Sequence, residues 1–185
     1  MKPWQRIEPT TVHKVGYRTI ISKTFKMPDG STQTWDIKDT EGSRAAAVIA
    51  LTPDNQVVIA RQYRPGQEAF LNELPGGEVD SGEDSEKAAL RELGEETGYV
   101  PGAIEFLGKV YKDGYSNSTT HFYLATDCTL KKGLKAPGPH EYIEVRLVSI
   151  DDLIAAAKGA QMTDIEAVFL AYDKLMQLKE KNNVQ

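Results

Sequence analysis

One acidic stretch, residues 76–99, constrains the fold and the chemistry of this chain more than any other. Its second half predicts a helix on which Glu92, Glu95 and Glu96 occupy positions i, i+3 and i+4, so that they share one face. Carboxylates one turn apart lie about 6 Å from each other, and at an effective dielectric of 20 each pair repels by about 3 kcal/mol. A fold can keep such a cluster by leaving it in water or by giving it cations.

Three neighbouring features favour cations over a solvated acidic face. Arg91 lies within the cluster and can reach Glu95 one turn further on. Glu83 precedes the helix, where it can fold back toward Arg91. A glycine-rich loop that starts at Gly76 can offer backbone groups to a ligand. Because Mg²⁺ takes its oxygen ligands from a few carboxylates and from substrate phosphates, the stretch predicts a divalent metal site.

These residues resemble the Nudix box, G-x5-E-x7-R-E-U-x-E-E-x-G-U, in which U is a bulky apolar residue. The fixed positions all match, from Gly77 and Glu83 through Arg91 to Gly98. The one difference is Tyr99, an aromatic residue at the last apolar position, where an aliphatic residue is more usual. The resemblance implies the Nudix fold and hydrolysis, with Mg²⁺ or alternatively Mn²⁺, of a nucleoside diphosphate linked to another group.

The resemblance also implies roles for individual residues. The metal ligands would be the backbone of Gly76 and the side chains of Glu92, Glu95 and Glu96. Arg91 would support them through a salt bridge to Glu83. In the ADP-ribose branch of the family a later loop carries an E-x-E pair with the general base, and here Pro139 and Glu141 occupy its two positions. Glu141 is therefore the candidate base, with Glu95 and His140 as alternatives.

A second run, Arg-Gln-Tyr-Arg-Pro at residues 61–65, resembles the ADP-ribose pyrophosphatase branch because Leu-Pro-Gly-Gly follows it shortly. Arg61 and Arg64 become candidate contacts for the diphosphate, since a guanidinium fork suits phosphate oxygens, although a solvent-facing strand end is the simpler interpretation. Glu73 either touches the substrate or pairs with an arginine. Gly114 stands where members dedicated to ADP-ribose carry a proline, so hexose-linked nucleotides such as GDP-mannose are also candidate substrates.

The first 42 residues are predicted to form a separate antiparallel sheet, with residues 43–185 as the Nudix domain. Residues 12–25 alternate like one strand, and residues 32–37 can return beside them after a Pro-Asp-Gly turn. A sheet this small is marginal alone. In related nucleotide sugar hydrolases it packs on a second subunit, which implies a homodimer. Tyr17 and Trp35 can pack there or provide a stacking platform for a base.

The remaining pattern predicts an α+β fold, an α/β/α sandwich around a mixed sheet. Capping patterns at Ser149 and Thr163 start two C-terminal helices. The predicted strands are residues 45–51, 57–63, 70–74, 104–110, 119–124 and 142–147.

Charge and composition exclude several functions. Residues 76–98 carry eight acidic and two basic residues, a local net charge of −6 within a chain of net charge −5. The sequence has no basic stripe, so nucleic-acid binding is not expected. Cys128 is the only cysteine, so no disulfide or cysteine zinc site is expected. The sequence has no apolar run of about 20 residues and no secretory signal, so a cytoplasmic protein without a membrane segment is expected.

The sequence thus predicts a Mg²⁺-dependent hydrolase of nucleoside diphosphate sugars that releases a nucleoside monophosphate and a sugar phosphate. Three alternatives remain: a Nudix-like regulator that binds nucleotides without hydrolysis, a clean-up hydrolase of other nucleoside diphosphate derivatives, and an RNA 5′-end hydrolase, for which the expected basic surface is absent.

Overall fold

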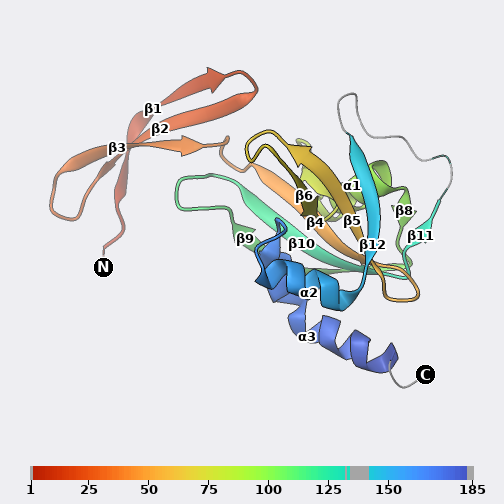
Figure 1. The fold of residues 1–185 in the computed structure, drawn as a ribbon. Coiled ribbons are helices and arrows are strands. Elements are labelled where there is room, and N and C mark those ends of the chain that lie inside the picture. The colour runs from red at the N-terminus through yellow and green to blue at the C-terminus, as the bar shows by residue number, and fades with distance from the viewer. Residues whose placement is uncertain (1, 132, 134–141, 183–185) are drawn as a thin grey trace. The chain divides into compact units, whose positions relative to one another are not determined.

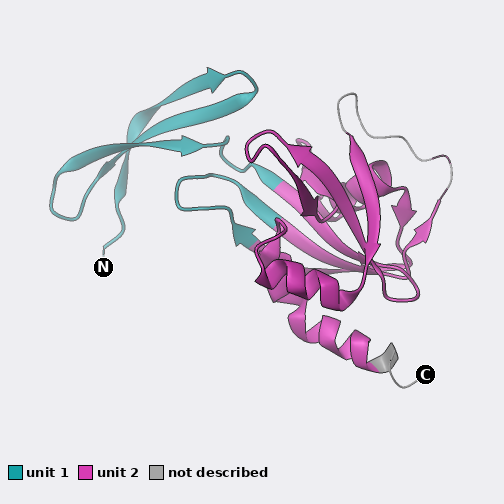
Figure 2. Ribbon diagram, in the orientation of Figure 1, with its two compact units in different colours: residues 1–44, 110–120 teal, residues 45–109, 121–185 magenta. Residues whose placement is uncertain are grey.

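The computed structural model describes residues 2–131, 133 and 142–182 of the 185-residue chain. The chain divides into two compact units (Figure 2), one of residues 1–44 and 110–120, the other of residues 45–109 and 121–185. The sequence predicts a boundary at residue 42 and places residues 110–120 in the larger part. The two units are described separately below.

The first unit is built on a three-stranded antiparallel sheet in the order β1-β2-β3. Its strands are β1 (Gln5–Val15), β2 (Arg18–Lys26) and β3 (Thr32–Lys38). The prediction of one strand over residues 12–25 is wrong, because a tight turn divides it. Gly16 adopts a left-handed φ of 61°, and Val15 pairs with Arg18 across the turn.

Residues 110–120 belong to this unit because polar contacts tie them to the sheet. The Lys23 ammonium donates to the Asn117 side chain over 2.6 Å, and Lys23 is only 9% exposed. Lys38 pairs with Asp113 over 2.6 Å, and the two chain segments also exchange backbone hydrogen bonds.

The second unit is built on a seven-stranded sheet in the order β12-β5-β4-β10-β9, with β6 paired to β5 and β7 paired to β4 (Figure 1). Its strands are β4 (Arg44–Leu51), β5 (Val57–Arg64), β6 (Ala69–Glu73), β7 (Gly76–Glu78), β9 (Ala103–Tyr111), β10 (Thr119–Thr126) and β12 (Ile143–Val148). Two further short strands, β8 (Tyr99–Val100) and β11 (Thr129–Leu130), pair with each other. The predicted long strands are confirmed; β7, β8 and β11 are too short for a periodic pattern to reveal.

Three helices cover the sheet: α1 (Ser85–Thr97), α2 (Ile150–Lys158) and α3 (Ile165–Asn182). Tyr123 and Ala125 of β10 belong to the buried cluster that includes Ala89 and Leu93 of α1. Leu124, between them in the strand, lines a cavity with α3. Because successive strand residues face opposite sides, α1 and α3 lie on opposite faces, and the predicted sandwich is confirmed.

The ends of the helices follow the predicted signals with one shift. Asp84 caps α1 by accepting from the Glu86 N–H at 2.9 Å, and Gly98 ends it at a left-handed φ of 77°. Ser149 and Asp152 form the predicted capping box of α2. Helix α3 begins at Ile165, so Asp164 precedes its first residue instead of Thr163. None of the described helices combines the length and apolar character needed to cross a bilayer.

Candidate active site

The predicted carboxylates lie on α1, beside the loop that follows β6. Ala88, Ala89 and Leu93 anchor the helix because they are fully buried against the sheet. The side chains of Glu92 and Glu95 are 16% and 26% exposed. This part of the helix therefore holds its acids at the edge of the core and not on a solvated face.

The two glycines of the loop bring its backbone against these acids. Gly76 and Gly77 belong to β7 and pair with Ala47 and Ala46 of β4. The Gly76 N–H donates to Glu96 Oε2 at 3.0 Å. A Cβ on Gly77 would overlap the Glu92 carboxylate, so this position requires glycine for the close approach.

Arg91 ties the acids together. Its guanidinium binds both oxygens of Glu83 at 3.1 Å, Glu92 at 2.7 Å and Glu95 at 3.3 Å, and it also donates to the Glu78 carbonyl. The predicted contacts of Arg91 with Glu83 and Glu95 are therefore present. The hydrogen bonds from Arg91 lower the pKa of Glu83, and Glu83 in turn raises the pKa of the guanidinium.

Glu96 is the most perturbed carboxyl of this cluster. Its pKa is raised to about 7, mainly by burial and also by the nearby charges of Glu92 and Glu73, while the Gly76 N–H and Arg64 oppose the rise. Without a cation Glu96 is therefore about half protonated near neutral pH. A bound cation would favour its ionised form, so the position suits a metal ligand.

Arg64 lies close to this cluster and is held by Glu73. The Glu73 carboxylate accepts from Arg64 Nε at 2.7 Å and from Arg64 Nη2, while Gln62 donates to the same carboxylate at 3.1 Å. The hydrogen bonds to Glu73 raise the pKa of Arg64, and the nearby negative charges of Glu96 and Asp164 act in the same direction. Gln62 is not among the predicted site residues, although strand alternation places it on the same face as Arg64 and could have indicated it.

Asp164 is an acid near Glu73 that the sequence did not indicate. Burial raises its pKa, and hydrogen bonds from the Thr163 hydroxyl and the Leu74 N–H oppose that rise. Its neighbours come from β6 and the loop after it, more than 80 residues earlier in the chain. A local sequence signal could not have revealed this contact.

Arg61 lies apart from Arg64. Three positions separate the two residues on β5, so their side chains face opposite sides of the sheet. Arg61 pairs with Glu144 of β12 at 2.9 Å and lies over the Phe70 ring, 4.6 Å from its centroid. The structure thus brings Arg64, and not Arg61, toward the acids of α1.

The remaining predicted site residues belong to the first unit or fall outside the described residues. Tyr17 and Trp35 belong to the first unit, where Tyr17 is 90% exposed and Trp35 stacks on Trp4 with centroids 4.9 Å apart. Their role as a platform for a base stays a prediction. Glu141 and the alternative base His140 lie outside the described residues.

The donor set fits a hard divalent cation in its chemistry. It offers three carboxylates and the carbonyls of a glycine loop, which are the oxygen ligands that Mg²⁺ prefers. Among the described residues, no three His, Cys, Asp or Glu side chains converge closely enough to enclose an ion. The carboxylates of Glu92 and Glu95 both pair with Arg91 in this structure.

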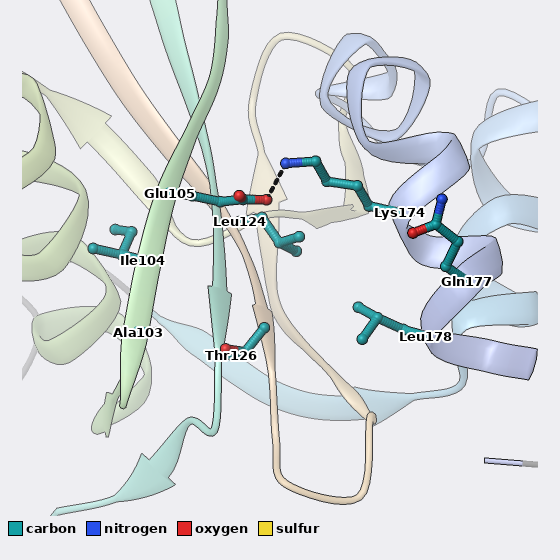
Figure 3. Close-up of a pocket in the computed structure, with 8 residues that line it drawn as sticks. All are labelled: Ala103, Ile104, Glu105, Leu124, Thr126, Lys174, Gln177 and Leu178. Carbon is teal, nitrogen blue, oxygen red and sulfur yellow. Dashed lines mark hydrogen bonds and ion pairs between the residues drawn. The ribbon is translucent and has the colours of Figure 1, made fainter. Parts of the chain in front are cut away.

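A cavity of about 530 Å³ lies away from this cluster, between β9, β10 and α3 (Figure 3). The charged side chains that line it, Glu105 and Lys174, pair with each other. Its other lining residues are mostly apolar, and we assign it no part in the chemistry.

Comparisons with known proteins find a family model, similar sequences and a similar fold. A family model described as NUDIX domain matches residues 42–170. The chain is 33% identical over 177 residues to the ADP-sugar pyrophosphatase of Mus musculus, covering 86% of this chain and 80% of the relative. It is 27% identical over 161 residues to the ADP-ribose pyrophosphatase of Bacillus subtilis (strain 168), covering 86% and 85%.

A third relative carries a different name. The chain is 31% identical over 156 residues to the methanol dehydrogenase activator of Bacillus methanolicus, covering 84% of this chain and 82% of the relative. Among solved structures, the crystal structure of an ADP compounds hydrolase matches with a TM-score of 0.75 and 20% identity, covering 93% of this chain and 97% of the other. At that identity the match establishes a shared fold.

Proposed function

We propose, from the premise that the chain belongs to the Nudix family of hydrolases, that it cleaves the diphosphate bond of a nucleoside diphosphate sugar. The candidate substrates are ADP-ribose and hexose nucleotides such as GDP-mannose, and the products are a nucleoside monophosphate and a sugar phosphate. The names of the mouse and B. subtilis relatives support an ADP-linked sugar. The observation that carries the proposal is the partly buried Glu96 carboxylate, on the same helix as Glu92, which accepts from the Gly76 N–H.

Glu92, Glu95, Glu96 and the Gly76 carbonyl would hold the divalent metal ion that Nudix proteins typically use. When bound, the ion neutralises charge on the diphosphate. Arg91 holds Glu92 and Glu95 before binding, and its links to Glu83 and to the Glu78 carbonyl keep the loop in register with α1. The proton of the attacking water would pass to Glu141, or failing it to Glu95.

Arg64 is suited to bind the phosphate oxygens that do not react. Its side chain is 45% exposed, whereas that of Glu73 is 8% exposed, so the pair offers its cation to a ligand and keeps its anion buried. Glu73 uses Nε and Nη2 of the fork, which leaves the other guanidinium N–H groups to donate to a phosphate.

Phosphate release from a substrate panel tests the proposal. The panel contains ADP-ribose, GDP-mannose, UDP-glucose, NADH, a diadenosine polyphosphate and the nucleoside triphosphates, each with Mg²⁺ and a coupling phosphatase. We expect turnover of ADP-ribose or of a hexose nucleotide, and its loss on addition of EDTA. Cleavage of the triphosphates alone would contradict the proposed substrate class.

A second candidate is a regulator that binds a nucleotide without cleaving it. The similarity to the methanol dehydrogenase activator is the observation that favours it. Calorimetric titration with the same panel separates the two candidates, because tight binding of one nucleotide without turnover of any would support the regulator.

A further inference from the structure

Gln62 lies on the face of β5 that α1 covers, between the two members of the Arg64–Glu73 pair. Alternate residues of a strand share a face, and Val58, four positions before Gln62, belongs to the core cluster that includes residues of α1. The strand register places Glu73 of β6 opposite Ala60. Because two residues of a strand span about 6.6 Å, Gln62 stands one such step from Ala60 and one step from Arg64. The ion pair therefore forms across Gln62.

The Glu73 carboxylate takes three hydrogen bonds from these two residues of β5. Its Oε1 accepts from Arg64 Nε at 2.7 Å. Its Oε2 accepts from Arg64 Nη2 and also from Gln62 Nε2, the latter at 3.1 Å. The side chain of Glu73 is 8% exposed, so water does not readily replace a donor that is lost.

Gln62 supplies a constraint that Arg64 cannot supply alone. Two parallel hydrogen bonds hold a guanidinium and a carboxylate in one plane, but that plane can still turn, because the last torsion of a glutamate side chain is soft. The amide of Gln62 reaches Oε2 from a separate point on the strand and so fixes the plane. The N–H groups of Arg64 that Glu73 does not use lie in the same plane, and their direction is fixed with it.

We propose that Gln62 is a positioning residue of the diphosphate site: by donating to Glu73, it fixes the direction in which Arg64 presents its remaining N–H groups to the substrate. The proposal rests on the proposed function, in which Arg64 contacts the phosphate oxygens. Gln62 itself acts through Glu73 and contacts no reacting atom.

Two substitutions remove the donor and keep the length of the side chain. Gln62→Met has no N–H, and Gln62→Glu, which has the shape of glutamine, sets a second carboxylate beside Glu73. The matched control is Gln56→Met, at an exposed glutamine directly before β5 in the same unit. Melting temperatures of all three variants separate unfolding from misalignment.

Steady-state kinetics on the preferred nucleotide sugar provide the first readout. We expect both Gln62 variants to raise KM about fivefold or more while kcat stays within about threefold, since Arg64 binds oxygens that do not react. Gln56→Met should stay within about twofold of the wild type in both constants. A fall in kcat at unchanged KM would indicate fewer folded molecules and would overturn the proposal.

An Arg64→Ala background tests the route. Both changes act on one path, so the further rise in KM from Gln62→Met should shrink below about twofold. A full rise in that background would overturn the route through Arg64.

The NMR signal of the Arg64 Nε–H group provides a readout that needs no turnover, and its loss in Arg64→Lys identifies it. We expect this proton to exchange with water at least about fivefold faster in Gln62→Met than in the wild type or in Gln56→Met. Equal exchange in all three proteins would overturn the positioning role. If the wild type cleaves no nucleotide sugar, the proposed function fails, and the exchange still decides whether Gln62 aligns Arg64.

Discussion

The surroundings of Glu96 differ strongly from those of an ordinary surface acid. Its pKa of about 7 in the folded protein lies above the ordinary value of 4.5, mainly because of burial. The metal-free folded protein therefore binds this proton more tightly than the unfolded chain. The resulting stability is fully present below pH 4.5 and is lost as the pH rises through 7, by up to about 3 kcal/mol.

We predict that Glu96→Gln, which cannot ionise, removes this pH dependence. In EDTA at pH 8 its free energy of unfolding should exceed that of the wild type by up to about 3 kcal/mol, and the difference should shrink toward pH 5. Urea unfolding of both proteins at the two pH values measures it. A difference that is the same at both pH values would mean that Glu96 titrates normally.

The two loop glycines should fail in different ways when alanine replaces them. A Cβ on Gly76 would lie 2.5 Å from the Ala46 carbonyl oxygen, which is rigid backbone, so Gly76→Ala should destabilise the fold by about 1–3 kcal/mol. A Cβ on Gly77 would meet the movable end of Glu92. Gly77→Ala should therefore keep most of the stability and lose activity. Melting curves and turnover of the same preparations check both, and equal behaviour of the two variants would contradict the geometry.

At the scale of elements, the fork of Arg91 joins helix α1 to the loop before it. Arg91→Lys keeps the charge but cannot bind both oxygens of Glu83 while it reaches Glu92. We expect at least about a tenfold loss of activity, since the loop and the metal carboxylates lose their common support. The control is Lys87→Ala, at an exposed position of the same helix. An Arg91→Lys variant with wild-type activity would contradict this, because the charge of residue 91 alone would then suffice.

The sequence reveals the elements whose signals are local and misses those that depend on distant contacts. Helix α1, its caps and the Arg91–Glu83 pair follow from fixed spacings within one stretch. The run at residues 61–65 predicts one shared role for Arg61 and Arg64, but strand alternation sets their side chains on opposite faces. The hydrogen bond from the Thr163 N–H to the Asn72 carbonyl joins segments that only the fold brings together, so no spacing could indicate it.

At the scale of the molecule, the first unit exposes several large apolar side chains of its small sheet. Val12, Val15 and Tyr17 are 58%, 68% and 90% exposed. We propose that a second copy of the chain covers them in a homodimer. Light scattering should then give about twice the chain mass of 20.5 kDa. Val12→Glu with Val15→Glu should lower that mass toward one chain, whereas a monomeric wild type would exclude the dimer.

We propose that the α1 carboxylates hold the metal ion required to cleave a diphosphate. The most direct test of this claim is the release of AMP from ADP-ribose by the wild type and by Glu96→Gln, each in Mg²⁺ and in EDTA. We predict rapid release by the wild type in Mg²⁺ only, and a loss of about 100-fold or more in Glu96→Gln, equal to about 3 kcal/mol of transition-state stabilisation. Release that persists in EDTA, or a Glu96→Gln variant as fast as the wild type, would contradict the claim.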